Sequence, residues 1–315
     1  MAVNRRTAVA VVVAALALTA TACNNDEKST GAASAAPTTA AAAQPTSAAP
    51  SATPEPTKEA PAKLTPAAYL KLVTEKTGSV KSAKITEEIL TGGATITATG
   101  TIGWSDGLQG DLSMDMSQLP VGQQMAKLTG SKTVPIRYLK DGMYLRLGGE
   151  VVEAVGGRHW LHYSYADMAA MNGATADQLK QADPVEGVRS LIASGKVAEA
   201  GQETVNGKPA THYTGQLTVD EMTAAAGSGV TDEQVQAMKK KLKTAGISSE
   251  QIDVWVDADN LVVKRTEQAD TKAGPFKVTV GYSDYGTAVS ATAPDQADVV
   301  EFAEIAKQAK GGAAG

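Results

Sequence analysis

The pattern of apolar and polar residues divides the chain into an apolar head, a polar linker and a long periodic segment. The head carries a pair of arginines, then an apolar run from Ala8 to Leu18, then small residues that end at Cys23. This order is typical of a secretory signal peptide, and the run is shorter than the roughly 20 apolar residues of a membrane-spanning helix. We therefore expect residues 1–22 to be a signal peptide.

A two-residue alternation of apolar and polar side chains dominates the periodic segment, residues 64–293. It is typical of strands with one dry and one wet face, which pair into an antiparallel sheet covered on one side. Asp141-Gly142 and Asn206-Gly207 are typical hairpin turns. Residues 117–133 are expected to form a loop. The expected strands, about ten in number, are residues 95–104, 108–117, 134–140, 143–147, 159–163, 197–205, 210–219, 251–257, 261–268 and 276–285.

Helices are expected at the start of this segment and at two insertions. Thr65-Pro66 forms an N-cap and first-turn proline, and Tyr69, Leu72 and Val73 share one face of the helix that follows. Capping sequences also precede helices that begin near residues 183 and 231, and residues 295–310 are expected to form a short helix. Sheet and helices together predict an α+β fold, a strongly curved antiparallel sheet with helices covering its concave side.

Composition changes sharply outside the periodic segment. Residues 29–62 consist almost wholly of Ala, Pro, Ser, Thr and Gly, which bury too little apolar surface to offset the entropy of ordering. We expect a disordered linker over residues 23–63, a folded domain over 64–293 and a short helix with a flexible tail over 294–315. The net charge of −5 argues against nucleic acid as a partner.

Cys23 is the single cysteine of the chain, so no disulfide can form within it. The sequence Ala20-Thr21-Ala22-Cys23 resembles the signal at which bacterial lipoproteins are cleaved and acylated, although Ala20 stands where a larger aliphatic residue is preferred. Acylation would anchor the chain to the outer face of the cytoplasmic membrane. The alternative is an ordinary signal peptide whose cleavage leaves a free cysteine.

Residues suited to catalysis or metal binding are few. The three histidines are His159, His162 and His212, and no glycine-rich phosphate loop accompanies them. A lone strand histidine such as His212 is a hydrogen-bonded side chain or, alternatively, a general base. These observations favour a protein that is no enzyme and holds no metal or cofactor. The lysine run Lys239–Lys243 is either a solvated helix face or a contact with an anionic membrane or partner.

A string of short motifs then resembles a known family. They are Asp141-Gly142-Met143-Tyr144, Thr204–Gly207, Thr211-His212-Tyr213, Asp253–Asp257 and Tyr282–Gly286, set behind the cysteine and the linker. This chain resembles the actinobacterial LppX/LprG-type lipoproteins, which share the LolA-like half-barrel fold. The resemblance implies a lipoprotein that binds acyl chains of lipids or glycolipids and carries or presents them in the cell envelope. The alternative is an envelope sensor or assembly protein that uses the same fold to bind a protein partner.

If the apolar face encloses a lipid pocket, its walls are the apolar residues on the dry side of the strands. Met adapts to irregular ligands and suits such a lining. The candidate lining residues are Ile96, Ile102, Leu112, Met114, Met116, Ile136, Met143, Leu145, Val254, Val256, Val263, Val278 and Val280.

Overall fold

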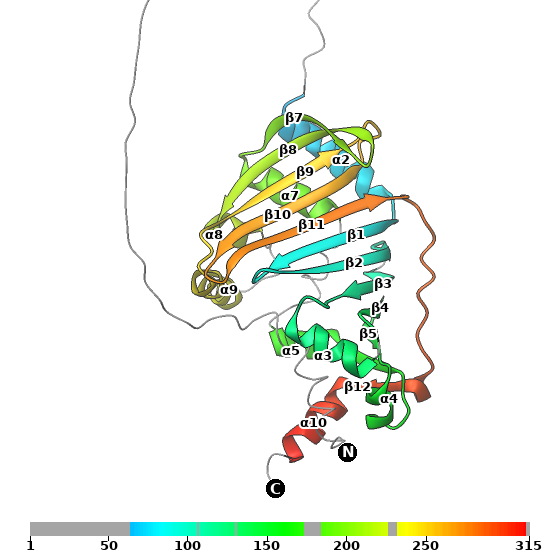
Figure 1. Ribbon diagram of the computed structural model, residues 1–315. Coiled ribbons are helices and arrows are strands. Elements are labelled where there is room, and N and C mark those ends of the chain that lie inside the picture. The colour runs from blue at the N-terminus through cyan, green and yellow to red at the C-terminus, as the bar shows by residue number, and fades with distance from the viewer. Residues whose placement is uncertain (1–63, 106, 130, 173–183, 226–231, 313–315) are drawn as a thin grey trace, which may run out of the picture. The chain divides into compact units, whose positions relative to one another are not determined.

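The computed structural model describes residues 64–105, 107–129, 131–172, 184–225 and 232–312. Within these residues twelve strands form one sheet, in the order β12-β6-β5-β4-β3-β2-β1-β11-β10-β9-β8-β7 (Figure 1). Every neighbouring pair is antiparallel except β12 and β6. The two edge strands, β7 and β12, stand at opposite ends of this order, so the sheet is open. The expected α+β class, with a large antiparallel sheet, is confirmed.

The elements have the following bounds. The strands are β1 Ser82–Thr91, β2 Ala94–Gly103, β3 Gln109–Asp115, β4 Thr133–Leu139, β5 Gly142–Arg146, β6 Trp160–Ser164, β7 Ala198–Val205, β8 Lys208–Thr218, β9 Ser249–Val256, β10 Val262–Thr271, β11 Gly274–Ser283 and β12 Val299–Glu301. The helices are α2 Pro66–Ser79, α3 Pro120–Thr129, α4 Glu150–Ala154, α5 Tyr165–Asn172, α7 Pro184–Ser194, α8 Val219–Ala225, α9 Asp232–Ala245, η2 Gln296–Asp298 and α10 Phe302–Gly312.

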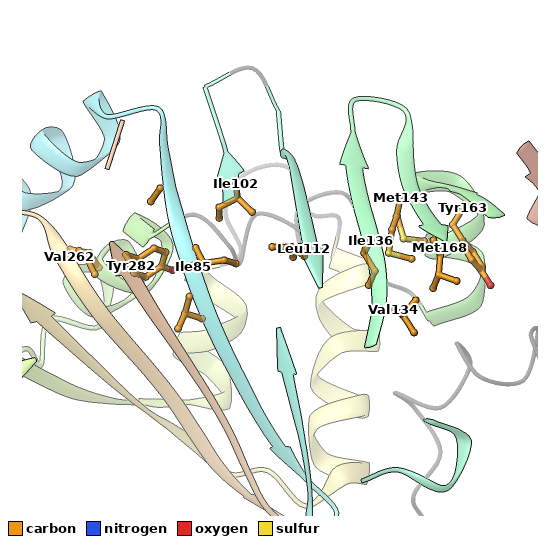
Figure 2. Packing of buried hydrophobic residues seen from close by; sticks show 14 of the residues in the cluster. Ile85, Ile102, Leu112, Val134, Ile136, Met143, Tyr163, Met168, Val262 and Tyr282 are labelled. Atoms are coloured by element: carbon orange, nitrogen blue, oxygen red, sulfur yellow. The ribbon is translucent and has the colours of Figure 1, made fainter. Parts of the chain in front are cut away.

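One face of the sheet carries the core, and we call it the inner face. Cross-strand partners place Ile85, Leu112 and Ile136 on this face, in a row that crosses β1, β3 and β4 by way of β2. Figure 2 shows these side chains following one another across neighbouring strands. The row belongs to one hydrophobic cluster that extends to Tyr163 and Phe302, whose rings stack with centroids 4.8 Å apart. The main core therefore extends across the sheet from β12 to β8.

The helices described pack mainly on the two ends of this inner face. At one end α7 lies on β8, β9 and β10, α2 packs on α7, and α8 contacts β8 and β9. At the other end α5 packs on β6, and α10 packs on β6 and β12. The central strands β1, β2 and β3 have no comparable helix partner in the described part of the chain. None of the described helices combines the length and apolarity needed to cross a bilayer.

Two segments differ from the sequence expectation. In the first, the inward-facing Glu87 interrupts the apolar alternation of the strand. Residues 82–91 form strand β1, which sits between β2 and β11 at the middle of the sheet and was not predicted. The segment 117–133, expected to be a loop, contains helix α3, Pro120–Thr129. In α2 the buried stripe is Leu70, Val73 and Thr77. Leu72, expected on that face, is 48% exposed.

The C-terminal segment also differs from the expected short helix. Residues 296–312 begin with the short helix η2, continue as strand β12 and end as α10. Val299, Val300 and Glu301 pair in parallel with β6, about 140 residues earlier in the chain. Sheet and core therefore extend beyond residue 293, the expected domain boundary.

Several sequence expectations lie outside the described residues. They concern the signal peptide (1–22), Cys23 and the linker (23–63), together with the capping residues near 183 and 231. These expectations stay predictions.

Candidate functional site

The inner face of the sheet, from β3 to β9, holds a group of mostly half-buried residues that we call the central patch. Three of its apolar members, Ile89, Met114 and Val278, lie on β1, β3 and β11 and are neither fully buried nor exposed. Ile89 stands opposite Val278 on one side and opposite Ile96 on the other. The patch is defined by Glu87, Ile89, Ile96, Met114, Glu250, Arg265, Glu267 and Val278.

Charged groups on the same face make this patch unusual for a sheet interior. Arg265 is only 2% exposed and lies opposite Val280, whose other cross-strand neighbour is Glu87. The Arg265 guanidinium contacts the Glu267 carboxylate, with Nη1 and Oε1 3.2 Å apart. The patch thus combines one guanidinium with three carboxyl groups among aliphatic side chains.

Burial changes the acidity of these carboxyl groups. The pKa of Glu250 is raised to about 7, mainly by desolvation and also by the neighbouring Glu267 carboxylate, whereas Arg265 opposes the change. Desolvation also raises the pKa of Glu87, again against the effect of Arg265. Glu250 is therefore largely protonated just below neutral pH. A neutral carboxyl group can donate a hydrogen bond and costs less to place beside apolar groups than a carboxylate does.

Helix α7 approaches β10 so closely that it covers the arginine. A Cβ atom at Gly187 of α7 would lie 2.4 Å from Cδ of Arg265, and one at Gly215 of β8 would lie 2.9 Å from Cδ2 of Leu191. Absence of side chains at these two positions permits the contact between helix and sheet. The Arg265 guanidinium is thereby held in place beneath α7.

The candidate lining residues lie mostly where the alternation placed them. All of them except Ile96 and Val263 belong to the main hydrophobic cluster or pack against it. Ile96 is also buried, at 9% exposure. The fully buried members fill the core, whereas Met114, Met116 and Val278 are half-buried. We therefore keep only the half-buried members, together with Ile96, as candidates for ligand contact.

Val263 differs from the expected placement. Pairing between β9 and β10 is irregular between Val262 and Lys264, so Val262 takes the core position while Val263 is half-buried outside the cluster. Beyond this irregularity Arg265 and Glu267 face inward, opposite Val254 and Ile252. Neither charged residue is among the expected lining residues, because a pattern of apolar positions assigns no face to charged ones. Alternation with Val263 could have placed them inward.

The outer face of the sheet carries a separate polar network that involves the histidine considered as a general base. His212 Nδ1 lies 2.9 Å from Oε1 of Glu203, and Nε2 lies 2.8 Å from Oδ1 of Asp253. Its ring stacks on Trp255, whose Nε1 donates a hydrogen bond to Glu203. Both ring nitrogens are therefore engaged in holding β7, β8 and β9 together, which favours the reading of His212 as a hydrogen-bonded strand histidine.

A hollow of about 240 Å³ borders the central patch, because Val134 in its wall pairs with Met114 across β3 and β4. It is open to solvent and lies beside β4 and the end of β5. Its walls are Ser131, Thr133, Val134, Pro135, Arg146, Leu147 and Gly148. Among the described residues, no three His, Cys, Asp or Glu side chains converge as metal ligands.

These features define an α+β domain with an open sheet whose inner face bears an apolar patch interspersed with carboxyl groups. Two sequences from Streptomyces are similar to this chain. An uncharacterized 31.2 kDa protein from the rplA-rplJ intergenic region of Streptomyces griseus is 40% identical over 251 residues, 78% of this chain and 82% of its own length. A Streptomyces coelicolor protein, provisionally named a lipoprotein, is 32% identical over 308 residues, 96% of each chain.

The chain belongs to the family of these two Streptomyces proteins. No protein-family model matches it. Among solved structures, the lipoprotein LppX of Mycobacterium tuberculosis aligns over 72% of this chain and 97% of its own, with 14% identity and a TM-score of 0.46.

Proposed function

We propose that this protein is a membrane-anchored lipoprotein that binds the acyl chains of a lipid or glycolipid along the central patch. In this proposal it carries or presents the bound lipid in the cell envelope. The observation that supports this most directly is the patch itself, where half-buried Ile89, Met114 and Val278 lie on strands β1, β3 and β11, which have no extensive helix packing among the described residues. Apolar side chains left partly exposed on a concave face are typical of ligand sites.

The carboxyl groups of the patch fit an amphiphilic ligand better than a purely apolar one. Acyl chains would pack on the aliphatic side chains, and the ester or hydroxyl groups of the lipid would meet Glu87 and Glu250. A protonated Glu250 can donate a hydrogen bond to an ester carbonyl, because burial raises its pKa to about 7. Binding, rather than catalysis, is the activity that these groups support.

The N-terminal sequence supports the anchored part of the proposal. Cys23 follows small residues after an apolar run, and one relative is provisionally named a lipoprotein. Acylation at Cys23 would place the domain at the outer face of the cytoplasmic membrane.

Lipid extraction from the full chain, purified from an actinobacterial host, tests the proposal. We expect organic extraction followed by mass spectrometry to release a lipid or glycolipid in near-stoichiometric amount, besides any acyl group on Cys23. A double variant, Ile89→Trp with Met114→Trp, should fill the patch and lose this lipid. The control, Thr97→Trp with Thr99→Trp, introduces the same two tryptophans at exposed positions of β2 and should keep the lipid.

Two outcomes would contradict the proposal in different ways. A parent protein that is repeatedly empty would argue against lipid binding and favour the protein-partner alternative. A filled variant that keeps its lipid, and whose fold is intact by circular dichroism, would show that the ligand lies elsewhere.

A further inference from the structure

Helix α9 is held at the periphery of the domain. Its apolar stripe, Val235, Met238, Leu242 and Ala245, is only half-buried and lies outside the main hydrophobic cluster. The helix packs on α8, where Lys239 Nζ donates a hydrogen bond to Asp220 Oδ1 at 2.6 Å. With its stripe turned to the domain, the helix presents its opposite side to solvent.

That exposed side is rich in lysine. Lys240, Lys241 and Lys243 are exposed, whereas the acidic residues of α9 are confined to its first turn, Asp232 and Glu233. Lys240 and Lys243 make no ion pair within the described residues. The positive charge stands out because the chain as a whole carries a net charge of −5.

A fourth lysine is fixed beside the C-terminal end of α9. The Ile247 amide bonds to the Leu242 carbonyl at 2.9 Å, and the Gly246 amide bonds to the Lys243 carbonyl at 3.1 Å, which closes the helix. The Lys272 amide then donates to the Ala245 carbonyl at 2.8 Å. The exposed Lys272 side chain therefore lies next to α9, on the turn between β10 and β11. Asp270 is the acidic residue nearest to it in this hairpin.

These contacts place the lysines at one particular end of the sheet. β10 ends and β11 begins at the Lys272 turn, and β1 ends where β11 begins, since Leu90 pairs with Lys277. Figure 1 shows α9 at this end of strands β10 and β11. Ile89 and Val278 of the central patch are paired close to the same end.

We propose that the lysine face, Lys240, Lys241, Lys243 and Lys272, is a docking surface for an anionic lipid membrane. The charge is complementary to the negative surface of such a membrane, and each lysine near it strengthens binding about fivefold. Weak attraction suffices for a chain that is already tethered at Cys23, because tethering raises the effective concentration. Docking turns the patch-bearing end of the sheet toward the bilayer. The surface deepens the proposed function by giving a route for lipid entry.

Vesicle flotation tests this surface separately from the anchor. The assay uses the full chain with Cys23→Ser, which cannot be acylated. This protein is mixed with phosphatidylcholine vesicles that either contain or lack phosphatidylglycerol. We expect binding only to the anionic vesicles, and its loss at high salt. In the same background K240E/K243E/K272E should weaken binding by about 100-fold. The matched control K71E/K76E/K81E changes the same charge on and beside α2 and should bind like the parent.

The outcomes separate docking from lipid binding. Equal flotation of the lysine variant and the parent, or no flotation of the parent on anionic vesicles, overturns the docking surface. Lysine-dependent capture of an acidic protein without vesicle binding overturns it in favour of a protein partner. Lipid content of each variant at equilibrium, measured by extraction, is expected to be unchanged, because the substitutions affect the route of entry and leave the central patch intact. A parent that floats but holds no lipid overturns lipid carriage alone.

Discussion

At the residue scale, the central patch places ionisable groups where water is scarce. Glu87, Glu250 and Glu267 share the inner face with Ile89 and Val278, and the guanidinium of Arg265 balances only part of their charge. Isolated carboxylates are costly to bury, so such groups take up protons instead. A protein that needed only a packed core would gain stability from apolar residues at these positions, which suggests that their role is in binding.

The variant Glu250→Gln tests the cost of burying this carboxyl group, because that cost makes the stability of the fold depend on pH. Because burial raises the pKa of Glu250 from 4.5 to about 7, the folded chain binds a proton between these pH values that the unfolded chain has released. Stability from this group is therefore full below pH 4.5, falls as pH rises through this window and is level above it. The variant should match the parent near pH 4.5 and exceed its stability above pH 7, by about 1–3 kcal/mol.

Urea unfolding at a series of pH values measures this difference. The control is Glu88→Gln, an exposed position on β1, which should change stability by no more than about 0.5 kcal/mol at any pH. Parallel stability curves for Glu250→Gln and the parent would show that Glu250 is ionised like an exposed acid.

At the element scale, α7 and β10 meet without room for a side chain at Gly187. Gly187→Ala places a methyl group 2.4 Å from Cδ of the buried Arg265 side chain, so helix or arginine must move. We expect destabilisation of about 1–3 kcal/mol, measured by denaturant unfolding. The control Gly78→Ala in α2 meets nothing within 4 Å and favours helix by up to about 1 kcal/mol. Equal stability of the two variants would contradict the close packing.

The same scale shows where sequence patterns identify elements and where they do not. Asn206 and Gly207 both have positive φ, at 51° and 77°, as the expected two-residue hairpin requires. Gly142, expected in a turn, instead begins β5, where a Cβ would lie 2.7 Å from Nε2 of His162. A glycine that follows Asp or Asn is compatible both with a turn and with the first position of a strand. Here the neighbouring strand β6, whose Ser164 pairs with Gly142, places this glycine in a strand.

At the scale of the whole molecule, the proposed anchor at Cys23 and the folded domain have separate roles, localisation and lipid binding. Cys23→Ser should move the protein from the membrane fraction to the soluble fraction, because acylation requires the cysteine thiol. Bound lipid should be retained, since the central patch is unchanged. Cell fractionation measures the change of location, lipid extraction measures the retained lipid, and mass spectrometry of the mature N-terminus detects acylation. A parent chain whose mature N-terminus is an unmodified cysteine would contradict acylation and leave lipid binding standing.

The sequence by itself determined the local features of this protein. Alternation identified most strands and their dry faces, since side chains of a strand alternate in direction whatever it pairs with. The apolar head before Cys23 predicts export, and this prediction too depends only on residues that are adjacent in the sequence. Tertiary structure alone decided what depends on distant partners. The irregular pairing at Val263 placed Arg265 beneath α7, and β12 joined β6 from across the chain. Such pairings are selected by packing of the whole core, which no single segment encodes.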